Sequence, residues 1–312
     1  MRTVCFLWMI AFISACGERE RSLSLNLKQI QTLDSIPSGS AIVQEQERLI
    51  LITDDAPFLY IGKDSFSFSS LQLKGYEPVP YRIPKDRKPD FEAASSVVFS
   101  DGRYIAAFGS GSVSPSRDSL LLIEVADLSR QTTISLTPLY RHLINTLSIA
   151  PRDWNIEGVA VIDDQLLLLN RGDNRIIFFP VVELERYLSQ GTLPVPQSYV
   201  LSLPRFQGKL ARLSGACALG TEGDVLFCAS IEDTPDWHSD GAVLGSFIGV
   251  FHHPTQSLKG VVLLKDSNGN ALREKVESVE VVHEQKGVYT IVAAVDNDDG
   301  NTRLLRLEMT WR

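Results

Sequence analysis

Three glutamates and two serines stand at corresponding places along the chain, each opening an apolar, alternating segment. The five segments are PSGSAIV, FEAASSV, IEGVAV, LSGACAL and VESVEV, and the residues are Ser38, Glu92, Glu157, Ser214 and Glu277. Carboxylates and hydroxyls are the hard oxygen ligands that Ca²⁺ binds in sets of six to eight, whereas Zn²⁺ prefers nitrogen or sulfur and Mg²⁺ a tighter octahedron. Brought together with one or two waters, these side chains predict a calcium site.

The same series of elements follows each opening residue. A second apolar segment comes next, then a polar cluster, then a third segment, and four of the five units add a fourth. The polar clusters are Asp54-Asp55, Gly109 to Ser112, Asn170 to Asp173, Glu232-Asp233 and Asp296 to Asp299. The opening residues are 54 to 65 residues apart. A unit of four short strands that repeats at such an interval is typical of the blades of a β-propeller.

The fifth unit stops after its third segment, at Arg312, and a spare segment, residues 24 to 33, precedes the first unit. Pairing this segment with the strand around Leu304 to Met309 closes the ring and removes its open edges. We therefore predict an all-β fold, a five-bladed propeller over residues 24–312 that is closed by its N-terminal strand. A six-bladed ring is the alternative. Only PLYRHLIN and VVELERYLSQG are expected to form short helices.

In a propeller the first strand of every blade lines the central channel, so the five opening residues are expected to form one ring around the axis. Three carboxylates in a narrow channel repel one another unless they are protonated or paired with a cation. Ca²⁺ is the cation that the ligand set favours. Neutralisation by the basic residues just upstream, Lys88, Arg212 and Lys275, is the alternative.

The polar clusters are expected to form a wider ring on the same face, with both acidic and basic side chains. Arg171 and Arg117 would neutralise phosphate oxygens together with the metal, and an acidic residue would orient an attacking water. This predicts a calcium-dependent hydrolase of phosphate esters or anhydrides. A non-catalytic propeller that binds a small anionic ligand or a protein is a second reading. A glycosidase that uses the central carboxylates is a third. The acidic candidates are Asp55, Asp173 and Asp296.

The order Ser, Glu, Glu, Ser, Glu, one residue per blade, resembles the central calcium site of the soluble calcium-activated nucleotidases (the apyrase family), which are five-bladed propellers. AFGSGS stands where that family has a Gly-rich loop, LLLLNRGD where it has an Arg-bearing loop, and VDNDDG where it has an acidic one. The likeness covers the pattern of the chain from about residue 24 to 312, without the Lys-Glu-Trp that follows the family's Gly-rich loop. It implies calcium at the five opening residues. Bacterial phytase-like secreted propellers are similar more weakly.

The N-terminus reads as an export signal. Residues 1–15 combine Arg2 with an apolar run from Val4 to Ile13 and then small residues, which is typical of a secretory signal peptide. The sequence Ile-Ser-Ala-Cys that ends at Cys16 resembles the bacterial lipobox, which implies an acylated Cys16, a tether over residues 16–23 and a lipid bilayer as partner. Gly17 at the second position implies sorting to the outer membrane of the cell envelope. An ordinary signal with a chance cysteine is the alternative.

Composition restricts the other partners and the cysteine chemistry. The formal net charge of −8 makes nucleic acid an unfavourable partner, and a monomer is expected. Cys217 and Cys228 stand symmetrically about a turn near Glu222-Gly223, so they are expected to face each other across two paired strands. For an oxidising compartment the sequence is compatible with two alternatives, a disulfide between them or two buried free thiols.

Overall fold

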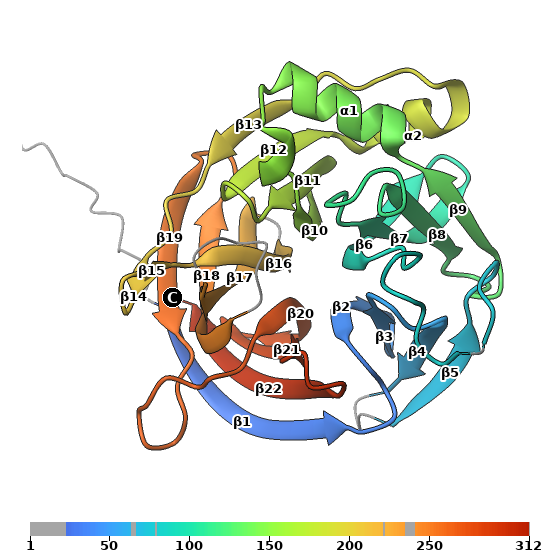
Figure 1. The fold of residues 1–312 in the computed structure, drawn as a ribbon. Coiled ribbons are helices and arrows are strands. Elements are labelled where there is room, and N and C mark those ends of the chain that lie inside the picture. Colours follow the sequence, from blue (N-terminus) through green and yellow to red (C-terminus); the bar gives the residue numbers. More distant parts are fainter. Residues whose placement is uncertain (1–22, 64–66, 79, 221, 235–240, 312) are drawn as a thin grey trace, which may run out of the picture.

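The computed structural model describes residues 23–311, apart from 64–66, 79, 221 and 235–240, and these residues form a ring of five four-stranded antiparallel sheets (Figure 1). The predicted five-bladed propeller is confirmed. Each blade begins with an innermost strand and ends with an outer one. The blades are β2 (Gly39–Glu45), β3 (Arg48–Thr53), β4 (Phe58–Gly62) and β5 (Phe68–Gln72); β6 (Phe91–Phe99), β7 (Gly102–Gly109), β8 (Ser119–Glu124) and β9 (Gln131–Ser135); β10 (Ile156–Ile162), β11 (Gln165–Asn170), β12 (Arg175–Pro180) and β13 (Gln197–Val200); β16 (Arg212–Leu219), β17 (Asp224–Asp233), β18 (Ala242–His252) and β19 (Ser257–Leu263); and β20 (Val276–Gln285), β21 (Val288–Asp296), β22 (Thr302–Trp311) and β1 (Leu23–Leu33).

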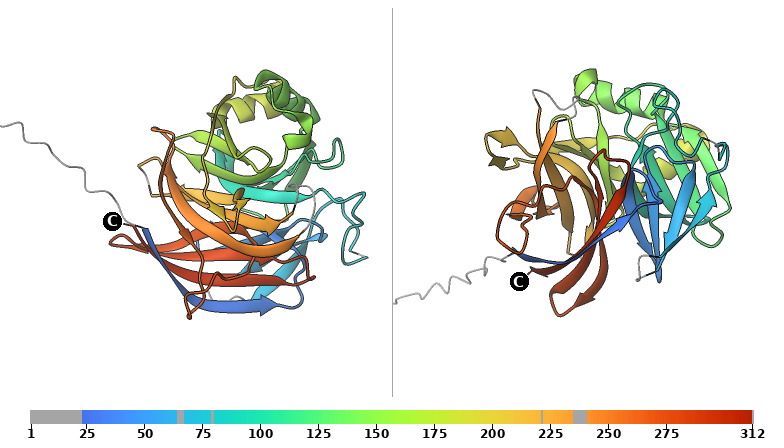
Figure 2. Two further views of the ribbon diagram at one scale, coloured as in Figure 1. Left: turned by 60° about the vertical axis from the view of Figure 1, so that its left-hand side comes forward. Right: turned by 60° about the horizontal axis from the view of Figure 1, so that its bottom comes forward.

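The N-terminal strand closes the ring as predicted. β1 lies antiparallel to β22 from the pair Leu23–Trp311 to the pair Leu33–Thr302 (Figure 2). Alternate residues of β1 turn inward, and Leu25 and Leu27 pack on the buried cluster shared by the fourth and fifth blades. The last blade is therefore complete only when the first strand, β1, pairs with the last strand, β22.

The core consists of the layers between neighbouring blades rather than of one central cluster. Five buried apolar clusters separate the five pairs of adjacent sheets. The second strand of a blade is covered on both faces, which explains why β3 and β11 are almost continuously apolar. The axis is left to the polar residues of the innermost strands.

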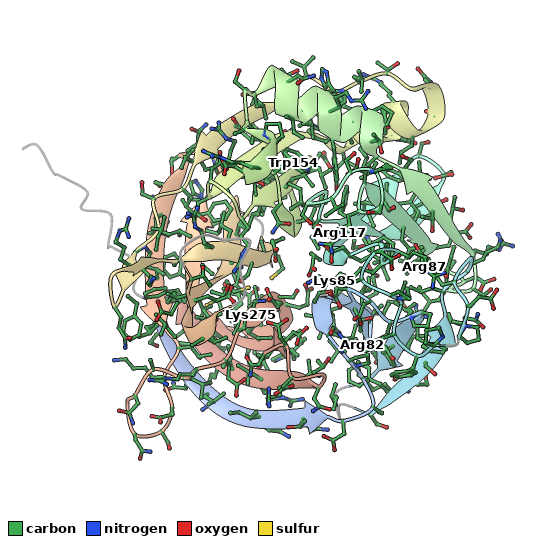
Figure 3. All side chains as sticks on the ribbon, viewed as in Figure 1. Arg82, Lys85, Arg87, Arg117, Trp154 and Lys275 are labelled. Carbon is green, nitrogen blue, oxygen red and sulfur yellow. The ribbon has the colours of Figure 1, made fainter. Side chains whose placement is uncertain are left out.

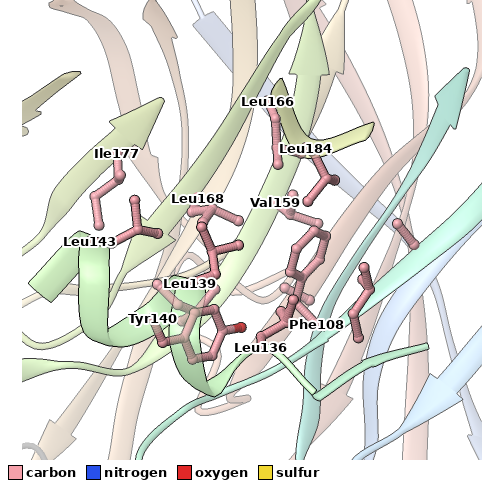
Figure 4. Close-up of a cluster of buried hydrophobic side chains, with 14 of the residues drawn as sticks. Phe108, Leu136, Leu139, Tyr140, Leu143, Val159, Leu166, Leu168, Ile177 and Leu184 are labelled. Carbon is pink, nitrogen blue, oxygen red and sulfur yellow. The ribbon is translucent and has the colours of Figure 1, made fainter. Parts of the chain in front are cut away.

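Two short helices fill the space beside the second and third blades. Pro138 lies in the first turn of α1 (Thr137–Thr146), and Gly191 in a left-handed conformation ends α2 (Val181–Gln190). Leu139 and Leu143 of α1 point into the cluster formed by these two blades (Figure 4). Both predicted helical insertions are present. A two-residue hairpin, β14 (Arg205–Phe206) and β15 (Lys209–Leu210), completes the elements.

Cys217 and Cys228 do not face each other, and this part of the prediction is wrong. The hairpin is centred one residue earlier than the sequence suggested, since its last pair is Leu219–Asp224. Cys217 therefore pairs with Leu226, and Cys228 with Gly215. Diagonal neighbours on a sheet are about 7–8 Å apart, which is long for a disulfide. Both residues are buried free thiols.

Residues 1–22, with the predicted signal peptide and Cys16, lie outside the described residues. None of the helices in the described part of the chain is long and apolar enough to cross a membrane.

Candidate functional site

Every innermost strand has a β-bulge within its first three residues. The bulges place one extra residue per blade outside the regular ladder: Ser40, Glu92, Glu157, Ser214 and Glu277. A bulge bends the strand and redirects the side chain of the extra residue. Four of the five predicted ring residues therefore occupy equivalent bulge positions at the head of the channel.

Ser38 is the exception, and its assignment to the ring is wrong. The bulge of the first blade holds Ser40, because the first ladder pair there is Gly39–Thr53 and the next is Ala41–Ile52. Ser38 lies before the strand with a positive φ of 46°. Its hydroxyl accepts a hydrogen bond from Arg82 Nη2 at 2.9 Å, so it belongs to the outer rim. Because Ser40 takes the place of Ser38 in the ring, the order Ser, Glu, Glu, Ser, Glu is unchanged.

The two ring serines tie neighbouring blades together. Ser40 Oγ donates to the Phe91 carbonyl at 2.5 Å, and Ser214 Oγ donates to the Val276 carbonyl at 2.6 Å. Each acceptor is the residue just before a ring glutamate of the next blade. A hydroxyl that donates its proton keeps two lone pairs, so the serine oxygens are still available as ligands.

The backbones of the innermost strands approach very closely at the ring. A Cβ added to Gly215 would lie 2.5 Å from the Glu277 carbonyl oxygen, and one added to Gly158 would lie 3.1 Å from the Gly215 Cα. Glycine after the bulge therefore lets the third, fourth and fifth blades meet at the axis. This is the physical reason for the Glu-Gly and Ser-Gly dipeptides.

Basic side chains enter the ring from the loops above it. Lys275 Nζ lies 3.0 Å from Glu277 Oε1, and Arg171 Nη2 lies 2.5 Å from Glu232 Oε2. Arg171 is buried and also donates to Ser230 Oγ at 2.8 Å. Arg212, expected among the neutralising residues, instead donates to the Gly172 carbonyl at 2.6 Å. Arg171, rather than Arg212, therefore supplies the positive charge that acts on Glu157.

A second acidic group adjoins the ring at the first and second blades. One carboxylate oxygen from each of Asp54, Asp90 and Glu92 lies within 4.8 Å of the other two. Lys88 bridges Asp54 and Asp90, with Nζ 2.6 Å from Asp90 Oδ1, and Arg117 Nη1 lies 2.8 Å from Asp90 Oδ2. Sequence reasoning missed Asp90, which stands two residues before the bulge; the only signal was its place in the charged stretch KPDFE.

The charges in this axial site do not balance. Six carboxylates face four cations, namely Asp54, Asp90, Glu92, Glu157, Glu232 and Glu277 against Lys88, Arg117, Arg171 and Lys275. Glu277 Oε2 is buried with no hydrogen-bond partner. With every carboxyl group ionised, the axial site would hold two negative charges in excess, which protons or a further cation would offset.

The acidities of the carboxyl groups reflect this excess. Burial raises the pKa of Glu157 to about 7, where Arg171 opposes the shift and Glu277 adds to it. The pKa of Glu92 lies well above its usual range because of burial and the charges of Asp90 and Glu157. Burial also raises the pKa of Asp54 to about 7, against the effect of Lys88. Near neutral pH the metal-free site therefore holds protons.

The predicted catalytic acids lie on the rim in different settings. Asp55 is buried and pairs with Arg82 Nη2 at 2.6 Å. Asp173 accepts from Arg175 Nε at 2.8 Å within its own blade, and the structure does not join it to the axial carboxylates. Asp296 is buried, and burial raises its pKa to about 6.

Figure 3 shows Lys85, Arg117 and Lys275 around the central opening, with Arg82 and Arg87 farther out.

One half-buried carboxylate lies farther along β20. Burial raises the pKa of Glu280 to about 8, and the neighbouring charge of Glu45 adds to this. A raised folded pKa contributes stability that is complete below pH 4.5 and is lost as the pH rises through 8. Glu280→Gln should therefore stabilise the protein relative to wild type at pH 9, by at most about 5 kcal/mol, and much less at pH 5. Urea unfolding of both proteins at the two pH values measures this, with the exposed Glu284→Gln as control. A pH-independent difference would contradict the assignment.

Solved structures share the fold at low sequence identity. A GH43 β-1,3-galactosidase matches with 10% identity and a TM-score of 0.53, over 86% of this chain and 56% of that one, so the chain spans little more than half of its length. Glutaminyl cyclase of Myxococcus xanthus has 11% identity and a TM-score of 0.49, over 92% and 97%. A streptogramin B lyase has 11% identity and a TM-score of 0.40, over 93% and 98%. At these identities the galactosidase supports the propeller fold alone.

Sequence comparisons place the chain in a family. No curated protein matches it. The model of the family of unknown function DUF6929 matches residues 35–309, nearly the whole described chain, and the protein is a member of that family.

Proposed function

We propose that this protein holds a divalent cation, Ca²⁺, in the ring of bulge residues and hydrolyses a phosphate ester or anhydride at that face of the propeller. The observation that carries the proposal is the convergence of three glutamates and two serines at five equivalent bulges, in a site with more carboxylates than cations. The resemblance to the calcium-activated nucleotidases supports the same assignment, with Ser40 in place of Ser38.

The ring residues fit a hard cation. Glu92, Glu157 and Glu277 supply carboxylates, and the two serines supply neutral oxygens, which is the ligand chemistry of Ca²⁺. The unpartnered Glu277 Oε2 is a buried acceptor that a cation would satisfy. When bound, the ion supplies a Lewis acid for a phosphoryl oxygen. Lys275 already pairs with the other oxygen of Glu277, so the ammonium and the cation would share this carboxylate.

The rim carries a basic side chain that is free to bind an anionic substrate. Lys88, Arg117, Arg171 and Lys275 are each paired with a carboxylate. Lys85, at the central opening in Figure 3, has no carboxylate within ion-pair distance in the part of the chain that the structure describes. We assign Lys85 to the phosphate group of the substrate. Asp296, with its pKa near 6, is the rim carboxyl group best suited to take a proton from an attacking water.

A phosphate-release assay tests the hydrolase. Purified protein would be incubated with nucleotides, sugar phosphates and phytate, each with Ca²⁺ and with EDTA in excess. We expect phosphate release from at least one substrate class with Ca²⁺ only. Because most rim cations are already paired, a binding protein without catalysis is the second candidate. Calcium binding without phosphate release from any substrate would favour the binding protein over the hydrolase.

Lys85→Ala should raise KM for the hydrolysed substrate by about tenfold and leave kcat within about threefold, since a charged contact on a non-reacting oxygen contributes to ground-state binding. Arg87→Ala, on the same loop and also exposed but farther from the central opening, is the matched control. Steady-state kinetics at constant Ca²⁺ measures both. Equal KM values for the two variants and wild type would remove Lys85 from the substrate site.

We also propose that the protein is anchored in the cell envelope through an acylated Cys16. Cys16→Ser should move at least nine-tenths of the protein from the membrane fraction to the released fraction, because two or more acyl chains are needed for stable anchoring. Ser14→Ala, in the same segment, is the control. Unchanged membrane partition of the Cys16 variant would refute the anchor.

A further inference from the structure

A small cavity lies between α1 and the loop of residues 111–118, outside the axial site. Its volume is about 190 Å³, and its walls include Asp118, Tyr140, Arg141, Ile144, Pro151 and Trp154. At roughly 30 Å³ per water it has room for about six waters, or for a ligand of six to eight non-hydrogen atoms. Figure 3 shows Trp154 farther from the central opening than Arg117.

A buried carboxylate without a counter-ion lines this cavity. Asp118 is only 3% exposed, and its Oδ2 accepts a hydrogen bond from Ser114 Oγ at 2.5 Å. Among the described residues, no basic side chain lies within ion-pair distance of it. A buried carboxylate is costly unless a cation compensates its charge. The carboxylate therefore favours a positively charged ligand group.

Two donors without partners line the same cavity. The indole N–H of Trp154, a residue 1% exposed, is buried with no hydrogen-bond acceptor. Arg141 is exposed on α1, and within the described ranges it has neither an ion pair nor a hydrogen bond. Both groups favour an anionic or strongly accepting ligand atom. Ile144 and Pro151 add apolar wall between them.

We infer that this cavity binds a small free α-amino acid as a zwitterion. Its ammonium group would pair with Asp118, and its carboxylate with Arg141 and the indole N–H. An aliphatic side chain would lie on Ile144 and Pro151. A ligand with one charge would leave either the acid or the arginine without a partner. The inference does not rest on the calcium site or on the proposed hydrolysis.

Calorimetric titration in EDTA tests the inference apart from any metal. The probes are L-valine, isobutylamine, which lacks its carboxylate, and isovalerate, which lacks its amine. We expect L-valine to bind and each analogue to bind at least tenfold more weakly. Asp118→Asn and Arg141→Gln should each weaken L-valine binding at least tenfold. The controls Asp127→Asn and Arg152→Gln, both exposed, should not.

Every other result overturns the inference. Absence of L-valine binding to wild type in the millimolar range would do so, as would isobutylamine binding as tightly as L-valine. Arg141 is exposed, so Arg141→Gln is expected to fold even if Asp118→Asn does not, and a melting curve for each variant checks this. Unchanged affinity in a folded Arg141→Gln protein would also exclude the zwitterion.

Discussion

Deleting residues 24–33 should leave less than about a tenth of the protein in the soluble fraction. These residues form almost all of β1, and their removal exposes the whole length of β22 as an unpaired edge. Long exposed edges recruit other chains through their free N–H and C=O groups. The deletion also uncovers apolar residues of the cluster between the fourth and fifth blades. Sedimentation of the lysate followed by size-exclusion chromatography measures the loss.

A point variant separates ring closure from a general effect of altering β1. Lys28 is exposed at the bulge of this strand, and its one ion pair among the described residues is with the half-exposed Glu308, so Lys28→Ala should remain as soluble as wild type. A deletion protein that stays monomeric with the melting temperature of wild type would contradict closure by β1.

Glu157→Gln should abolish most of the rise in melting temperature that Ca²⁺ produces. A ligand at 100 times its Kd stabilises the folded state by about 2.7 kcal/mol, which corresponds to a rise of roughly 5–10 °C for a domain of this size. The substitution removes one of three ring carboxylates without changing the size of the side chain. Thermal unfolding with and without millimolar Ca²⁺ measures the difference.

Matched controls locate the effect in the ring. Glu185→Gln, on α2 at the protein surface, should keep the full calcium-dependent rise. Ser40→Ala should reduce it, whereas Ser38→Ala should not, because Ser38 lies on the rim with Arg82. If Glu157→Gln and Glu185→Gln respond equally to Ca²⁺, the ring glutamates do not hold the ion.

The sequence was sufficient for the architecture because each blade repeats one physical pattern. Alternating apolar segments, polar clusters and a spare N-terminal segment specified five sheets and their closure. The register within a blade was harder. Ser38 and Ser40 flank the same glycine, and only the ladder of β2 and β3 shows which one is the bulge residue. For the same reason, the predicted centre of the hairpin that contains Cys217 and Cys228 lay one residue too far along the chain.

The pairings of the side chains around the axis could not be predicted. Asp90 belongs to none of the repeated polar clusters, and it meets the ring only once the blades have closed. Arg171 was predicted at the site, but its partner Glu232 is a residue of another blade. Such contacts depend on loop conformation, which strand periodicity does not specify.

The most direct measurement of the central proposal is the metal content of the purified protein together with its melting temperature in excess EDTA and in millimolar Ca²⁺. The account predicts about one Ca²⁺ per chain and a higher melting temperature with Ca²⁺. If the protein holds no metal by elemental analysis and melts at the same temperature in both solutions, Lys88, Arg171 and Lys275 neutralise the ring unaided. The likeness to the calcium-activated nucleotidases would then be one of architecture only.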